Sequence, residues 1–227
     1  FYGEGIFTQR TFRRGGVHAE ALMNTQTSIA GQIQGADVGL PLLRHGAADQ
    51  LAELRVRPCT ILLPEAAAPY LHYIRDVLEL LPENAADRGA LTDILKALAE
   101  RLLSARQDGV WQQVLDCPGR AGNYAESSGS SMIVYALLKG ARLGLLSATV
   151  GQEAQSAFDA LVRHFVGQMR DGTLFLAKCC QCAGLGGSGG RDGSFDYYVS
   201  EPVISYDLKG TGAFIQAACE MERTLEK

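Results

Sequence analysis

The sequence lacks both dense basic segments and long apolar runs, and each absence excludes a class of protein. The net charge of the 227 residues is −4 at pH 7, and the closest approach to a basic run, at 10–14, is short. A nucleic-acid-binding role is therefore not expected. No stretch approaches the roughly 18 apolar residues that a membrane span needs, so no membrane insertion is expected. No signal-peptide pattern follows Phe1, and the missing initiator methionine predicts a fragment or a processed chain.

Cysteine motifs and clustered histidines are scarce as well. Only Cys179 and Cys182 form a Cys-x-x-Cys pair among the six cysteines, and no histidine or second pair lies near it. A zinc site needs four well-placed ligands, so metal binding is a minor alternative. A chain of this size does not need disulfide bonds, and we expect small, mostly buried, free thiols in a reducing compartment, the cytoplasm. The histidines are isolated from any triad context: His18, His45, His72 and His164.

The composition that is present is that of an ordinary globular protein, with 47% hydrophobic and 20% charged residues. It can supply a sizeable core. Residues 1–69 keep no apolar period for long and are treated as a first segment, in which only 18–33 and 47–54 read as helices. From Tyr70 onward, apolar residues recur at helical spacing. This second segment, 70–227, is predicted to hold helices at 70–81, 91–103, 127–143, 152–169 and 208–225.

A turn motif recurs between the predicted helices. Asp-Gly followed by an aromatic residue occurs at 108–111, 171–175 and 192–195. The Asp-Gly pair favours a tight turn, and the aromatic residue is expected to cap the end of the helical layer. Short strands are expected at 110–115 and, where apolar and polar residues alternate, at 195–200.

Helical hairpins with recurring turns are typical of stacked repeats, in either an open solenoid or a closed toroid. The predicted helix at 127–143 is apolar nearly all round, whereas the others are amphipathic. This difference favours a toroid with an inner and an outer ring of helices.

Two polar loops are candidates for a functional site. The loop at 122–131 places an amide, a phenol, a carboxylate and a hydroxyl at the entrance of the apolar helix: Asn123, Tyr124, Glu126 and Ser128. These groups are suited either to capping the helix or to lining a carbohydrate pocket, with Trp111, the only tryptophan, as a stacking platform.

The second loop is rich in glycine at 184–190 and continues into Arg191 and Asp192. Its backbone can approach a ligand closely, so it is either a functional loop or a plain surface connection. It also contains a formal G-x-G-x-x-G match at 184–189. That match lacks the preceding strand and the following helix that a dinucleotide site requires, and we reject it.

Two sets of motifs carry a specific order and spacing. The first is DGVWQQVLD at 108–116 followed by GNYAESSGS at 122–130. The second is AGLGG at 183–187, RDGSFDYYVSEP at 191–202 and KGTGAF at 209–214. They resemble glycoside hydrolase family 105, the unsaturated rhamnogalacturonyl hydrolases, which are related to family 88. The resemblance extends from about Tyr70 to the C-terminus.

The resemblance implies an all-α fold, an (α/α)6 toroid of paired helices that is incomplete in this chain, with short strands in loops. It also implies removal of a terminal unsaturated uronic acid from pectin-derived rhamnogalacturonan oligosaccharides. In that mechanism an aspartic acid protonates the C4=C5 double bond and activates the water that adds at C5. No metal and no organic cofactor is implied. The implied partner is an oligosaccharide, and the oligomeric state stays open.

The chain also departs from the family pattern. The family's acid/base aspartate, and a sugar-binding motif that contains Trp and Arg, precede the matched region, but PEAAAP at 64–69 contains neither residue. Asp37 and Asp49 stand in no matching context, so no catalytic residue is assigned. A missing N-terminal part, a degenerate paralogue and a slipped reading frame in the first third all remain open.

Two functional hypotheses follow: the hydrolase, or a non-catalytic sugar-binding or scaffold paralogue. Arg191 is expected to pair with a uronate carboxylate or with Asp192. The predicted substrate-binding residues are Trp111, Asn123, Tyr124, Glu126, Ser128, Arg191, Asp192 and Tyr197.

Overall fold

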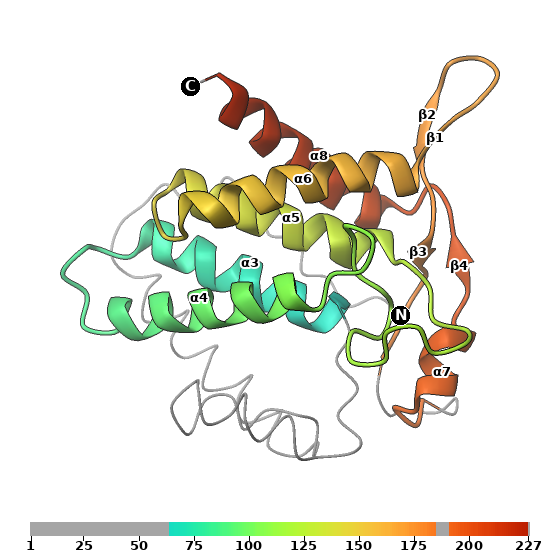
Figure 1. The fold of residues 1–227 in the computed structure, drawn as a ribbon, viewed down its shortest axis with the longest axis horizontal. Helices are drawn as coiled ribbons and strands as arrows, with labels where there is room; N and C mark the ends of the chain where they lie inside the picture. The colour runs from blue at the N-terminus through green and yellow to red at the C-terminus, as the bar shows by residue number, and fades with distance from the viewer. Residues whose placement is uncertain (1–63, 185–190, 227) are drawn as a thin grey trace, which may run out of the picture. The chain divides into compact units, whose positions relative to one another are not determined.

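A computed structural model describes residues 64–184 and 191–226, all of which belong to a compact unit that spans Leu51–Lys227. The predicted helices at 18–33 and 47–54, Asp37, Asp49 and the glycine segment at 185–190 lie outside the described residues. The described part is mostly helical (Figure 1).

The five predicted helices are present, with shifted ends. The helices are α3 (Pro64–Leu80), α4 (Arg88–Ser104), α5 (Ser127–Arg142), α6 (Ala148–Phe165) and α8 (Leu208–Leu225). Helix α6 begins four residues earlier than predicted because Ser147 caps it, accepting a hydrogen bond from the Val150 N–H at 3.3 Å. None of the helices in the described ranges is long and apolar enough to cross a membrane.

Helix α5 lies at the centre of the described fold. Its residues are nearly all buried, from Ser127 to Gly140 with few exceptions, as the apolar pattern predicts. It packs against α3, α6 and α8. Small residues at its start and aliphatic side chains such as Ile133 and Leu137 along its length let three helices approach it at once.

Helices α3, α5 and α8 run parallel and form a row (Figure 1). Glu79 of α3 pairs with Lys139 of α5 at 2.7 Å, near the C-terminal ends of both helices. On the other flank, Arg142 near the end of α5 pairs with Glu220 of α8 at 2.7 Å. Helices α4 and α6 run in the opposite direction, because each is joined to its predecessor by a short turn. Alternation of this kind is what the inner and outer rings of a toroid require.

The connections at the two ends of the row differ greatly in length. At the C-terminal ends of α3 and α5, the links are the short turns 81–87 and 143–147. At the N-terminal ends of α5 and α8, the links are the long connections 105–126 and 166–207. We call this second end the long-connection end. Long connections on a rigid helical frame are where binding residues concentrate in other proteins.

One predicted strand is wrong, and the other is only partly right. Residues 195–200 form a short helix, α7 (Phe195–Ser200), which is capped by Ser194. Phe195 and Tyr198 are its buried residues, so the burial period is three rather than two. Within 110–115, Val110 and Gln112 make isolated bridges, with Gln107 and Ala125 respectively, and residues 113–115 then bend into a turn, so no regular strand forms.

Two small strand pairs occupy the connection between α6 and α8. Strand β1 (Val166–Gln168) pairs antiparallel with β2 (Leu174–Leu176), and the pair projects from the end of α6 (Figure 1). Strand β3 (Cys179–Cys180) pairs with β4 (Val203–Ile204). The short strands predicted for the loops are therefore present, at these positions.

The recurring Asp-Gly turns are confirmed by their backbone angles. Gly109, Gly172 and Gly193 have φ values of 87°, 89° and 76°, a region that glycine enters without a steric penalty. After the first turn, the Trp111 indole N–H donates a hydrogen bond of 2.6 Å to the Leu102 carbonyl in the last turn of α4. This aromatic residue therefore caps the helix, as predicted.

Candidate functional site

All eight predicted site residues come from the two long connections or the first turn of α5. The connection 105–126 and α5 supply Trp111, Asn123, Tyr124, Glu126 and Ser128. The connection 166–207 supplies Arg191, Asp192 and Tyr197. The structure divides them into a buried group at the start of α5 and a rim group beside α7.

Glu126 is the centre of the buried group. Its side chain is fully buried, and its carboxylate accepts hydrogen bonds from the backbone N–H groups of Ser128 at 3.0 Å and Gly129 at 2.7 Å. The Ser128 hydroxyl donates to the same carboxylate at 2.8 Å. The Cys180 N–H of β3 donates to it at 3.0 Å. Glu126 thus caps α5 and also ties strand β3 to the start of that helix.

Lys209 at the start of α8 completes this connection. Its ammonium group donates to the Cys180 carbonyl at 2.9 Å, so the starts of α5 and α8 both bind the backbone of Cys180 in β3. The thiol of Cys179 lies in the same environment. Burial, and then the negative charge of Glu126, raise the pKa of Cys179 to about 12. This thiol is therefore held in its neutral form at physiological pH.

The remaining residues of the first loop organise the connection itself. The Asn123 amide donates to the carbonyls of Val114 at 2.8 Å and Cys117 at 3.0 Å, and to the Gln112 side chain at 2.9 Å. Its oxygen accepts from the Val114 N–H at 3.1 Å. Asn123 therefore spends its hydrogen-bonding capacity on the loop rather than on a ligand. Tyr124 is partly buried beside it.

Trp111 does not offer a face to a ligand. The side chain is fully buried, and its ring packs in the main core with its N–H directed at α4. The expectation of a sugar-stacking platform therefore needs correction at this position. A tryptophan beside polar loops suggested a sugar platform, but Trp111 follows Val110, which is also buried, and this apolar pair was the local signal for a core residue.

The rim group contains the residues that solvent can reach. Arg191 is exposed, and its guanidinium lies 3.9 Å from the Cys182 sulfur. The same guanidinium packs against Gly184. If residue 184 carried a Cβ, that atom would lie 3.0 Å from Nη1 of Arg191. The Tyr197 hydroxyl accepts from the Gly184 N–H at 3.1 Å. Arg191 and Tyr197 thus converge on the described end of the glycine-rich segment.

Arg191 and Asp192 do not form the ion pair that was one of the two alternatives for Arg191. Asp192 accepts a hydrogen bond from the Ser194 N–H at 2.9 Å, and this contact lowers the pKa of Asp192. Its carboxylate therefore completes the Asp-Gly turn rather than neutralising Arg191. Burial and a hydrogen bond with Glu201 raise the pKa of Tyr197, so its phenol stays protonated.

Sequence reasoning missed three polar residues of the buried group. Gln113 is fully buried, and its amide nitrogen lies 3.4 Å from the Cys180 sulfur. Lys209 belongs to the KGTGAF motif at 209–214, and Cys180 lies within the Cys179–Cys182 pair, but neither was predicted to have a role. For Lys209 the sequence did contain a local sign: it is the second residue of α8, and its N–H donates to the capping residue Asp207.

The described cysteines and histidines do not form a metal centre. Among residues 64–184 and 191–226, no three His, Cys, Asp or Glu side chains are grouped closely enough to hold a metal ion. The five cysteines in these ranges are free thiols. The expectation that most are buried is wrong for Cys182 and Cys219, which are exposed, and holds for Cys179 and Cys180. His72 and His164 are helix residues, as predicted.

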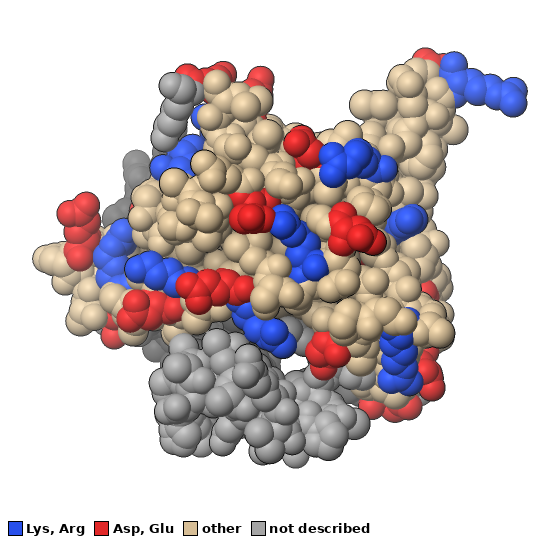
Figure 2. Space-filling model, in the orientation of Figure 1, with Lys and Arg blue, Asp and Glu red and all other residues tan. Residues whose placement is uncertain are grey.

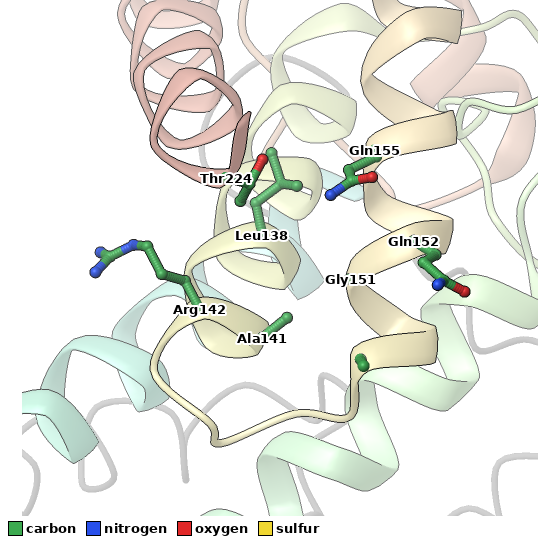
Figure 3. A pocket seen from close by; sticks show the side chains of 8 residues that line it. Leu138, Ala141, Arg142, Gly151, Gln152, Gln155 and Thr224 are labelled. Atoms are coloured by element: carbon green, nitrogen blue, oxygen red, sulfur yellow. The ribbon is translucent and has the colours of Figure 1, made fainter. Parts of the chain in front are cut away.

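A hollow of about 260 Å³ lies elsewhere, between α5, α6 and α8 (Figure 3). Gln155 and Thr224 face each other near Leu138, whereas the Arg142 guanidinium points away from the hollow (Figure 3). The lining contains none of the predicted site residues. It lies beside the short turn 143–147, away from the polar loops, so it is not the predicted carbohydrate pocket. On the surface seen in Figure 2, positive and negative side chains alternate without a dense patch of one sign.

Comparisons with known proteins agree with the described fold. Residues 66–225 match the family model described as Glycosyl Hydrolase Family 88. Protein Atu3128 of Agrobacterium fabrum is 42% identical over 154 residues, which cover 64% of this chain and 65% of that protein.

Two solved structures are similar as well. A glycoside hydrolase from family 105 of C. acetobutylicum matches with a TM-score of 0.70 and 45% identity, covering 72% of this chain and 46% of that one. A possible member of the GH105 family from Salmonella enterica matches with a TM-score of 0.62 and 25% identity, covering 74% of this chain and 41% of that one. The chain thus spans less than half of each solved structure, and the predicted all-α, toroidal fold class is confirmed.

Proposed function

The chain belongs to glycosyl hydrolase family 88, and we propose that it removes a terminal unsaturated uronic acid from pectin-derived rhamnogalacturonan oligosaccharides. The family match over 66–225 is the observation that carries the proposal. It is supported by the place of the family-like motifs: those at 122–130 and 191–202 both belong to the long-connection end. No cofactor is part of the proposal.

The rim group is the proposed contact with the sugar acid. An exposed guanidinium can hold a carboxylate through two parallel hydrogen bonds. Arg191 is exposed, and its contact with the Cys182 sulfur is weak at 3.9 Å. Tyr197 is half-buried and protonated, and its hydroxyl accepts from Gly184; it can donate to a sugar oxygen if the substrate replaces Glu201 as the acceptor of its proton. Glu126 and Asn123 are proposed to position these segments without touching the substrate.

The proposed reaction is hydration. A proton adds to C4 of the double bond, and the hydroxyl of water adds to C5. The adduct then rearranges, and the glycosidic bond breaks. The acid/base group must deliver a proton and then accept one. Glu126 is saturated by four donors, and the pKa of Asp192 is lowered, so neither fits this role. We assign no catalytic residue within the described ranges.

That mismatch favours a second candidate function: a sugar-binding paralogue that keeps the helical frame without catalysis. Both candidates require the rim group to bind an unsaturated uronate. They differ in whether the double bond is consumed.

One experiment separates them. The chain is incubated with an unsaturated galacturonyl-rhamnose disaccharide, and the ultraviolet absorbance of the conjugated double bond is followed, while calorimetry measures binding. The Arg191→Gln variant is compared with Arg163→Gln, which alters an exposed arginine on α6. A disaccharide with a saturated uronate serves as the ligand control.

Hydrolysis predicts an absorbance decay that Arg191→Gln slows about tenfold or more, corresponding to a lost charge-assisted contact, and that Arg163→Gln leaves unchanged. Binding without decay would support the non-catalytic paralogue. Absence of both binding and decay would reject the proposed carbohydrate function.

A further inference from the structure

One tyrosine ring of the connection 166–207 is exposed beside the hairpin of β1 and β2. Tyr206 is 52% exposed, and its ring stacks on that of Phe175 in β2, with the ring centres 5.1 Å apart and the planes at 28°. Its hydroxyl donates to the Met169 sulfur at 3.2 Å, and its backbone N–H donates to the Leu176 carbonyl at 3.0 Å. These contacts hold the ring in one orientation.

The ring that supports Tyr206 is itself fixed. Phe175 is half-buried and lies opposite Gly167 of β1. A Cβ at residue 167 would collide with the Phe175 ring, so glycine is what allows this ring to lie against the neighbouring strand. Because Phe175 covers one face of the Tyr206 ring, the surface that solvent reaches is the other face and the outer edge.

The backbone of Tyr206 is strained. Tyr206 has a φ of 65° and Lys178 a φ of 57°, and they are two of the three non-glycine residues with positive φ in the described ranges. A bulky side chain seldom adopts this conformation, and such strain concentrates at ligand-binding and active sites. Lys178 directly precedes β3, and Tyr206 follows β4 by two residues, so both lie at the same end of this antiparallel pair.

The other end of the β3–β4 pair leads to the rim group. Cys182, two residues after β3, contacts Arg191 at 3.9 Å, and Glu201, two residues before β4, is hydrogen-bonded to the Tyr197 hydroxyl. Tyr206 is five residues from Glu201, which corresponds to about 16 Å of extended chain at about 3.3 Å per residue. A disaccharide held at the rim group does not span this length, but a longer oligosaccharide does.

We propose that Tyr206 is a second sugar-binding position, which stacks on an inner ring of an oligosaccharide whose terminal unsaturated uronate is held by the rim group. One face of a pyranose ring consists largely of C–H groups, and packing it on an aromatic ring removes apolar surface from water. Lys178 and Ser205 are exposed at the same end of the β3–β4 pair, and their ammonium and hydroxyl groups are suited to sugar oxygens. The stacking role predicted for Trp111 thus falls to Tyr206.

The inference rests on the proposed function, because both positions bind one carbohydrate. Calorimetry with two rhamnogalacturonan oligosaccharides, a disaccharide and a hexasaccharide that each end in unsaturated galacturonate, tests the two separately. Tyr206→Asn removes the ring and keeps a residue that tolerates positive φ. The dissociation constant of the hexasaccharide is expected to rise about fivefold, equivalent to about 40 Å² of lost apolar contact, whereas that of the disaccharide stays unchanged.

Two control variants isolate the ring. Tyr206→Phe keeps the stack on Phe175 and is expected to bind both oligosaccharides as the parent chain does. Leu174→Ser removes an exposed leucine of the same hairpin, on the opposite face from Phe175 because side chains alternate along a strand. It is expected to leave both dissociation constants unchanged. Circular dichroism checks that each variant keeps its helices.

The outcomes separate this inference from the function on which it rests. Binding of both oligosaccharides with no effect of Tyr206→Asn, or with an equal loss for both, would overturn the second position and leave the proposed function intact. A parent chain that binds neither would reject the proposed function and the second position together. A dimer in light scattering that Tyr206→Asn dissociates would assign the ring to a protein contact, and would also overturn the proposal.

Discussion

Glu126→Ala is the substitution that probes the organisation of the candidate site most sharply. The buried carboxylate accepts hydrogen bonds from three backbone N–H groups, those of Ser128, Gly129 and Cys180. Each buried donor left without an acceptor costs about 1–3 kcal/mol, and partial relaxation of the cavity recovers some of that sum. We therefore expect the free energy of unfolding to fall by about 3–5 kcal/mol.

Two further substitutions calibrate this magnitude. Glu126→Gln keeps the volume and one acceptor oxygen, so we expect a loss of about 1–3 kcal/mol. Asp207→Ala is the matched control, because Asp207 caps α8 by accepting from the N–H groups of Lys209 at 2.9 Å and Gly210 at 3.2 Å. Asp207 is only half-buried, so water can replace it, and a loss of about 1 kcal/mol is expected.

Urea unfolding followed by the fluorescence of Trp111 measures these differences, since this is the only tryptophan and it lies in the core. Midpoints are compared at unchanged slope. If Glu126→Ala costs no more than Asp207→Ala, the reasoning that Glu126 joins β3 to α5 is refuted.

Three further predictions follow from single contacts. Burial acts to raise the pKa of Glu220, but its bonds to two arginines hold that pKa below the ordinary value. The ionised Glu220 therefore contributes to the free energy of unfolding at pH values above its unfolded-state pKa, and this contribution is lost as pH falls through its folded-state pKa. Glu220→Gln should accordingly make stability, measured by urea unfolding, depend less on pH in the acid range. Gly109→Ala should lower the free energy of unfolding more than Gly119→Ala does, as measured by urea unfolding. Both glycines have positive φ, but only at residue 109 would the new Cβ lie 2.5 Å from the Cβ of Ala160. Equal losses would contradict this packing. Cys182 should react with a thiol reagent in the folded protein at mildly alkaline pH, whereas Cys179, with a pKa of about 12, should react only on unfolding, as mass spectrometry of labelled peptides would show.

Much of the helical frame could be predicted because its apolar residues recur at helical spacing. Helix α8 has the predicted limits, and the Asp-Gly turns have the predicted angles. The strand predicted at 195–200 was wrong because Phe195, Tyr197 and Val199 alternate with polar residues, as they would in a strand. Their burial is instead set by packing of Phe195 and Tyr198 against Val114, a partner far away in the sequence. The capping serine before this helix was the local signal.

The candidate site was predicted in its location along the chain more than in its chemistry. Glu126 was correctly considered as a helix-start residue, but its bond to Cys180 depends on a strand pairing that no local pattern reveals. Trp111 and Asn123 have polar atoms that suit a ligand equally well, and only their burial and partners show that they hold the fold together. Arg191 and Tyr197 remain the residues proposed to meet the substrate.

Hydrogen–deuterium exchange with and without the unsaturated galacturonyl-rhamnose disaccharide tests the central claim most directly, because it reports where the sugar acts. The account predicts added protection in 178–184 and 191–201, at the long-connection end. Protection instead around Leu138 and Gln155, at the hollow between α5, α6 and α8, would contradict it.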